Sequence, residues 1–74
     1  MFDKTENTVI SVNGMHCNHC KARVENALKA LKGVKKFEVS LENGSATVAY
    51  VAKKITPEDI ASAITQSGFE AKVK

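Results

Sequence analysis

Two cysteines, Cys17 and Cys20, are the residues of this sequence best suited to chemistry, and they stand three positions apart. A disulfide between them would close a very small loop and would restrain little of the unfolded chain. In a reducing compartment, such a pair more often binds a metal or carries out redox chemistry. Thiolates are soft ligands that select Cu(I), zinc and similar ions over hard cations. The pair therefore points to soft-metal binding or to thiol chemistry.

The number of available ligands narrows the choice of ion. A structural zinc site takes four ligands, usually from two separated pairs, and this chain has a single cysteine pair. With the two cysteines, His16 and His19 would make a set of four possible ligands. Four ligands within five residues, however, do not easily surround a tetrahedral ion. Cu(I), a closed-shell ion, accepts two thiolates in a near-linear arrangement, so Cu(I) is favoured. Both histidines are expected to be exposed loop residues in preference to metal ligands, although His16 is also a candidate third ligand.

The elements that position the cysteines follow the order strand, helix, strand, strand, helix, strand. This order is the ferredoxin-like βαββαβ plan of the α+β class, a four-stranded antiparallel sheet with both helices on one face. Alternating apolar residues predict the strands, and apolar residues at helical spacing predict the helices. The predicted strands are residues 8–13, 34–41, 45–51 and 69–73, and the predicted helices are residues 18–32 and 57–67.

Residue types at the ends of these elements support their boundaries. Gly33 is expected as the left-handed residue just after the first helix. Asn43 and Gly44 predict a tight hairpin turn in which both residues tolerate positive φ. Thr56 suits the N-cap of the second helix, and Pro57 suits its first position. The residues expected to face the core are Ile10, Val12, Cys20, Val24, Ala27, Leu28, Leu31, Phe37, Val39, Leu41, Ala46, Val48, Tyr50, Pro57, Ile60, Ala61, Ile64, Phe69, Ala71 and Val73.

In this arrangement Cys17 belongs to the loop before the first helix and Cys20 to its first turn, so the two sulfurs converge on one point. The N-terminus of a helix carries partial positive charge and unpaired N–H groups, which stabilise thiolates and lower their pKa. Met15 is expected in the core, where it anchors the loop, in preference to acting as a thioether ligand.

The pattern Gly14-Met15-x-Cys17-x-x-Cys20, placed on the loop into the first helix of a βαββαβ chain, resembles the heavy-metal-associated domain family. The resemblance spans residues 8–73 and includes Gly33-Val34 and Gly68-Phe69. The family includes cytosolic copper chaperones and N-terminal domains of copper-transporting P-type ATPases, and the bacterial CopZ-type chaperones are the most similar members. Residues 1–74 are then expected to form a single heavy-metal-associated domain, with an ordered core of about 8–73.

The resemblance implies that Cys17 and Cys20 bind one Cu(I) ion per monomer and pass it to a partner by thiolate exchange. The implied partner is a CxxC-bearing domain of a copper-transporting P-type ATPase or a copper-responsive regulator. Met15, His16 and Phe69 are then supporting residues beside the metal. His16 departs from the Ser or Thr common in the family, and Phe69 departs from the Tyr usual in bacterial chaperones, since Phe occurs in many ATPase domains.

Charge and composition exclude several other classes of function. The formal net charge is +3, and residues 15–36 hold six basic residues against one acidic residue. This concentration, which includes Lys21 and Arg23, is either a solvated helix face or a surface that steers the protein toward an acidic partner. Three phenylalanines, one tyrosine and no recognition motif argue against nucleic acid binding. The longest apolar stretch, residues 48–52, is too short to span a membrane, and with no secretory signal a cytoplasmic protein is expected.

Alternatives to a copper carrier remain open at this stage. The chain is alternatively a detached N-terminal domain of a P-type ATPase, or a mercury- or zinc-binding relative of the same fold. Zinc relatives tend to carry an acidic residue beside the cysteines, and none is adjacent here. A thiol-disulfide oxidoreductase is disfavoured because the chain is short and its one proline, Pro57, opens a helix. A monomer is expected, with a copper-bridged dimer as an alternative state.

Overall fold

The structure is a computed structural model that describes residues 4–74, and expectations placed on residues 1–3 lie outside the described residues. It contains four strands and two helices in the predicted βαββαβ order, which confirms the ferredoxin-like fold class. The elements are β1 (Thr5–Asn13), α1 (Asn18–Lys29), β2 (Val34–Ser40), β3 (Ser45–Val51), α2 (Pro57–Gln66) and β4 (Glu70–Val73).

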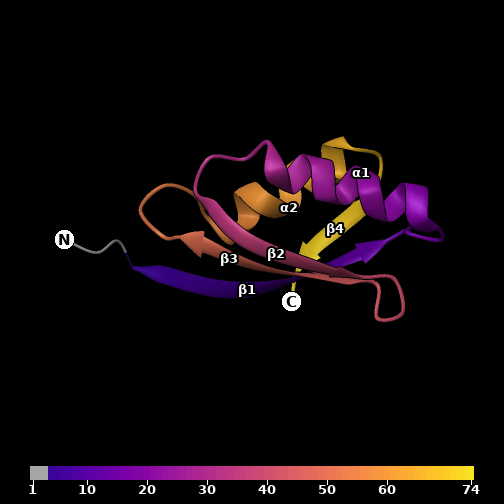
Figure 1. Cartoon of the computed structure of the whole chain (residues 1–74), viewed down its shortest axis with the longest axis horizontal. Helices are drawn as coiled ribbons and strands as arrows, with labels where there is room; N and C mark the ends of the chain where they lie inside the picture. The colour runs from indigo at the N-terminus through magenta and orange to yellow at the C-terminus, as the bar shows by residue number, and fades with distance from the viewer. Residues whose placement is uncertain (1–3) are drawn as a thin grey trace.

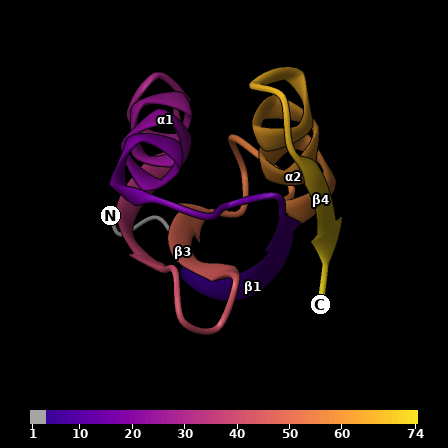
Figure 2. The same cartoon turned by 90° about the vertical axis from the view of Figure 1, so that its right-hand side faces the viewer.

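The four strands form one antiparallel sheet in the order β2-β3-β1-β4. Both helices cover the same face of this sheet, and they lie side by side above it (Figures 1 and 2). Strand β1 is central, pairing with β3 on one side and β4 on the other. The chain therefore leaves the middle of the sheet at Asn13 and turns directly into the loop that carries the cysteines.

Strand β1 begins at Thr5, three residues earlier than the sequence predicts. Its polar first residues pair with β3, in the register Thr5↔Val51 and Asn7↔Ala49. Because the backbone of β3 extends to Val51, it offers partners to this polar stretch. Residues 5–7 were not predicted as part of the strand because they are polar and do not alternate with apolar side chains.

Helix α1 ends at Lys29, so the predicted end at Lys32 is wrong. The N–H of Leu31 donates to the carbonyl of Leu28 (3.2 Å), which tightens the chain into a shorter turn after the helix. Leu31 nevertheless packs against the core, as its spacing predicts. Gly33 has a φ of 99° but lies in the connection to β2, where its carbonyl accepts a hydrogen bond from Val51 N–H (2.7 Å).

The β2–β3 connection also differs from its prediction. Pairing ends at Ser40↔Ser45, so residues 41–44 form a four-residue turn and not a two-residue one. Gly44 has a φ of 61°, whereas Asn43 does not have a positive φ. The hydroxyl of Ser40 accepts a hydrogen bond from the N–H of Asn43 (3.2 Å), which stabilises this wider turn.

Helix α2 begins as its sequence predicts. The hydroxyl of Thr56 accepts from the N–H of Asp59 (3.2 Å), and the Asp59 carboxylate accepts from the N–H of Thr56 (3.3 Å). This reciprocal pair satisfies two donors at the helix start, and Pro57 occupies the first helical position without losing a hydrogen bond.

The core lies between the sheet and the two helices. It includes most of the residues expected there, together with Val51 and Ile55, which the sequence reading did not include. Val73 was expected in the core but is 39% exposed, since β4 is an edge strand and Val73 is its last residue. Of the residues expected to face the core, those that are only half-buried are Cys20, Ala27, Leu31, Phe37, Leu41, Pro57 and Ala71. Within residues 4–74, neither helix has the length and apolar character needed to cross a membrane.

Candidate metal centre

The two cysteines belong to the junction between β1 and α1. Cys17 is the N-cap of α1, with extended backbone angles (φ −152°, ψ 174°), and Cys20 is the third residue of the helix. Their Sγ atoms lie 3.6 Å apart. Cys17 is exposed and Cys20 is half-buried. The structure thus brings both sulfurs to one point at the surface, where a soft ion and an incoming ligand have access to them.

The cysteine loop, residues 14–20, is anchored on the core. Met15 is 6% exposed and belongs to the core cluster, as predicted. Phe69 is also buried, and its Cδ1 lies 3.5 Å from the position that a Cβ on Gly14 would take. The residue just before β4 therefore packs against the beginning of the loop, in the place that the family resemblance implies for Phe69.

The start of α1 favours negative charge. The Cys17 side chain makes no capping hydrogen bond, and the first turn contains no acidic residue that would neutralise the positive end of the helix dipole. A hydrogen bond from the His16 backbone is the main cause that holds the pKa of Cys20 below its ordinary value. The Cys17 side chain, the Cys17 backbone and the charge of Arg23 also lower that pKa, while partial burial opposes them.

The structure does not add the histidines to the cysteine pair. His16 and His19 are both exposed. Within residues 4–74, no three His, Cys, Asp or Glu side chains lie close enough together to hold one ion. Among residues 4–74, the candidate site is therefore the pair of thiols, and the backbone of His16 lowers the pKa of Cys20. The sequence did not lead us to expect that the His16 backbone would lower the pKa of Cys20. The available signal is the position of His16 just before the N-cap of a helix.

The basic residues of α1 differ in their surroundings. Lys21 is half-buried, and its N–H donates to the carbonyl of Cys17 (3.1 Å). Arg23 is exposed, and its Nη1 lies 3.8 Å from the position that a Cβ on Gly68 would take. The Arg23 side chain therefore reaches from α1 to the turn before β4. Sequence reasoning assigned Arg23 to a partner-facing surface and missed this placement.

The sequence profile of the heavy-metal-associated domain family matches residues 9–70. The chain belongs to this family. It is 41% identical over 63 residues to the copper chaperone CopZ of Enterococcus hirae, and this match covers 85% of this chain and 91% of CopZ. It is 42% identical over 66 residues to copper-transporting ATPase 2 of Homo sapiens, which covers 89% of this chain but only 4% of that protein.

The fold of this chain is also similar to that of a solved copper-binding domain. The copper-binding domain from HMA7, a P-type ATPase, matches this heavy-metal-associated domain with a TM-score of 0.90 and 35% identity, covering 92% of each chain. The chain thus spans nearly the whole of a small chaperone and a small part of an ATPase.

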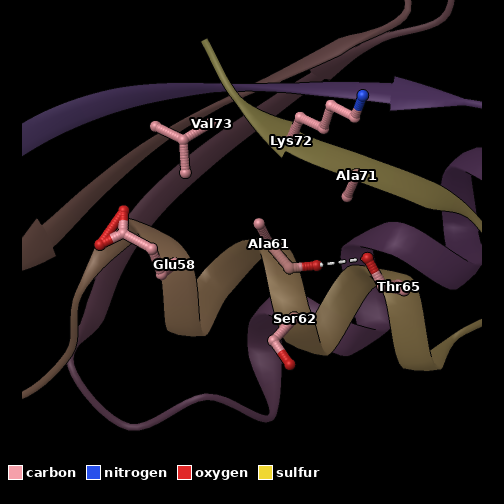
Figure 3. A pocket seen from close by; sticks show the side chains of 7 residues that line it. All are labelled: Glu58, Ala61, Ser62, Thr65, Ala71, Lys72 and Val73. Atoms are coloured by element: carbon pink, nitrogen blue, oxygen red, sulfur yellow. Dashed lines mark hydrogen bonds between the residues drawn. The ribbon is translucent and has the colours of Figure 1, made fainter.

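A surface cavity of this heavy-metal-associated domain lies away from the cysteines. It has a volume of about 460 Å³ and lies between α2 and β4 (Figure 3). The Thr65 hydroxyl at its edge donates to the carbonyl of Ala61 (3.0 Å), within the same helix. The lining residues are Glu58, Ala61, Ser62, Thr65, Ala71, Lys72 and Val73, and none is a cysteine or histidine. The cysteine pair is therefore an exposed loop site outside this cavity.

Proposed function

We propose that this heavy-metal-associated domain is a cytoplasmic copper chaperone that carries one Cu(I) ion between Cys17 and Cys20. The observation that carries the proposal is the pair of sulfurs 3.6 Å apart on an exposed loop at a helix N-terminus. Two soft donors without a third one suit Cu(I) better than a tetrahedral zinc ion. The similarity to CopZ, described as a copper chaperone, and to copper-transporting ATPase 2 supports copper as the cargo.

Transfer follows from the low coordination number of the ion. A thiolate of the partner adds to the two-coordinate Cu(I) and forms a third Cu–S bond, after which one of the original Cu–S bonds breaks. The oxidation state of copper does not change, and no free ion is released. Cys17 is the more exposed ligand, so the partner thiolate approaches on its side, while the half-buried Cys20 keeps its bond until later. The chain is then a carrier with no catalytic turnover.

The partner is a CxxC-bearing domain of a copper-transporting P-type ATPase or of a copper regulator. Lys21 and Arg23 belong to the first half of α1, next to the loop, and Lys21 is half-buried while Arg23 is exposed. A partner with an acidic face would be attracted to this surface before the ligands exchange. Lys21 and Arg23 are the basic residues nearest to the cysteines in the sequence, and they would contact such a face.

A transfer experiment tests this function. The chain is loaded with one equivalent of Cu(I), mixed with the metal-free CxxC domain of a copper-transporting ATPase, and separated by ion exchange for metal analysis. We expect copper to redistribute between the two proteins faster than it passes to a soluble chelator of equal affinity. The matched control is an acceptor whose two cysteines are serines, which should receive none. Transfer no faster than to the chelator would contradict direct exchange.

A second candidate is that the chain acts as a metal-binding domain of a longer P-type ATPase. The high identity to a short stretch of copper-transporting ATPase 2 and the presence of Phe69 favour it. The ligand chemistry is the same in both cases, but the ATPase domain receives copper where the chaperone delivers it. The length of the full reading frame distinguishes the two candidates.

A further inference from the structure

Arg23 lies one helical turn after Cys20 on α1, and its side chain extends toward the turn between α2 and β4. Its Nη1 is 3.8 Å from the position that a Cβ on Gly68 would take. The next residue, Phe69, packs against the beginning of the cysteine loop at Gly14. Residues three positions apart on a helix are neighbours, so Arg23 lies beside Cys20 on α1.

The charge of the loaded site depends on the ion that it holds. Cu(I) between two thiolates gives a complex with a net charge of −1. Zn(II) between the same thiolates, with neutral water completing its coordination, gives a net charge of zero. A fixed cation beside the site stabilises the Cu(I) complex, with its net charge of −1, by Coulomb attraction. The same cation has no such effect on the neutral Zn(II) complex. Both ions bind to the same empty protein, so the protonation of the empty site cancels in the ratio of the two affinities.

We propose that Arg23 is a selectivity residue whose charge favours a monovalent soft ion over a divalent one. The inference rests on the proposed function, because it takes Cys17 and Cys20 as the two ligands. The positive end of the α1 dipole also lies at the site, so Arg23 supplies only part of the effect. Since Arg23 is exposed, we expect a change in selectivity of about two- to fivefold at low salt. Added salt should reduce this change, because it screens exposed charges.

The test measures the ratio of the Cu(I) and Zn(II) association constants by competition with a chromogenic chelator for each ion. The variants are Arg23→Gln, which removes the charge, and Arg23→Lys, which keeps it. The matched control is Lys29→Gln, which removes the same charge from the last turn of α1. Lys29 is nine residues from Cys20, about 14 Å along the helix axis, which exceeds the screening length of about 8 Å. Circular dichroism checks that each variant is folded.

We expect Arg23→Gln to lower the ratio by about two- to fivefold, with Arg23→Lys and Lys29→Gln close to the wild type. The proposal is overturned if Arg23→Gln behaves like Lys29→Gln, or if Arg23→Lys loses as much selectivity as Arg23→Gln. Failure of the proposed function has a different signature, because the wild type itself would then fail to bind Cu(I), or would still bind it tightly after Cys17→Ser.

Discussion

At the scale of single residues, the site depends on the different backbone positions of two like side chains. Cys17 is an extended N-cap residue and Cys20 is helical, and this combination brings their sulfurs within 3.6 Å of each other. An N-cap residue usually satisfies helix N–H groups with its own side chain, but the Cys17 thiol makes no such bond. The positive end of the helix is therefore left to stabilise thiolate charge.

Cys20 should react as a thiolate at lower pH than an ordinary cysteine. The His16 backbone, the Cys17 side chain and Arg23 all lower its pKa in the folded chain, and these contacts are lost on unfolding. Alkylation by iodoacetamide, mapped by mass spectrometry across a pH series, measures the midpoint for Cys20. We expect this midpoint to be lower in the folded protein than in the same chain unfolded in urea. An equal or higher midpoint in the folded protein would show that these contacts do not stabilise the thiolate.

The cysteine pair and the buried position of Met15 could be predicted from the sequence because both depend on local spacing and on the loop-to-helix junction. The contact of Arg23 with the Gly68 turn could not, and the contact of Phe69 with the loop followed only from the family resemblance. They join segments about 45 and 55 residues apart, and their geometry depends on how the second half of the chain packs on the first. Local pattern thus supplies the ligands, while tertiary packing supplies their surroundings.

At the scale of elements, local hydrogen bonds and turns set the boundaries that the spacing of apolar side chains did not predict. The hairpin is wider than Asn43-Gly44 suggests because the hydroxyl of Ser40 competes for a backbone N–H. Helix α1 stops at Lys29, although Leu31 continues its apolar spacing, because a shorter turn also buries that residue in part. The cap of α2 was predictable because Thr56, Pro57 and Asp59 act within one helical turn.

Gly33→Ala should destabilise the fold more than Gly44→Ala. Gly33 has a φ of 99°, and a Cβ there would lie 2.9 Å from Lys54 Cβ, closer than real Cβ atoms approach. The added strain should cost about 1–3 kcal/mol of unfolding free energy. Gly44→Ala, at a φ of 61°, places its Cβ at 3.5 Å from the Val12 carbonyl, an ordinary contact.

Urea denaturation of both variants measures the difference in unfolding free energy. Because φ 61° lies in the left-handed region that alanine can adopt and φ 99° lies beyond it, the comparison measures the backbone strain and the close contact of Gly33 together. Equal destabilisation by the two variants would show that the chain relaxes around Gly33 and removes the extra strain.

At the scale of the whole molecule, charge is distributed unevenly around one exposed site. Residues 15–36 hold six basic residues and one acidic residue, although the whole chain has a formal charge of only +3. The cysteine loop is at the beginning of this segment. Two chains that share copper through facing loops therefore bring Lys21 and Arg23 of both chains together, whereas an acidic partner meets a complementary charge.

Self-association and partner binding should respond to salt in opposite directions. We expect the copper-loaded chain to be a monomer at low salt, with a copper-bridged dimer increasing as salt screens the repulsion over about 8 Å at physiological ionic strength. Association with an acidic CxxC domain should weaken over the same salt range. Sedimentation velocity at several salt concentrations measures both equilibria. A dimer favoured by low salt would mean that the basic segment lies away from the contact.

Competitive Cu(I) titration of the wild type, Cys17→Ser and Cys20→Ser under anaerobic conditions tests the central claim most directly. We expect the wild type to bind one Cu(I) per chain tightly, and each serine variant to lose tight binding because one thiolate alone forms no chelate. His16→Ala and His19→Ala serve as controls and should bind like the wild type, since neither imidazole joins the cysteine pair. Tight binding that survives in either serine variant, with a histidine in place of the missing thiolate, would contradict the two-thiolate site.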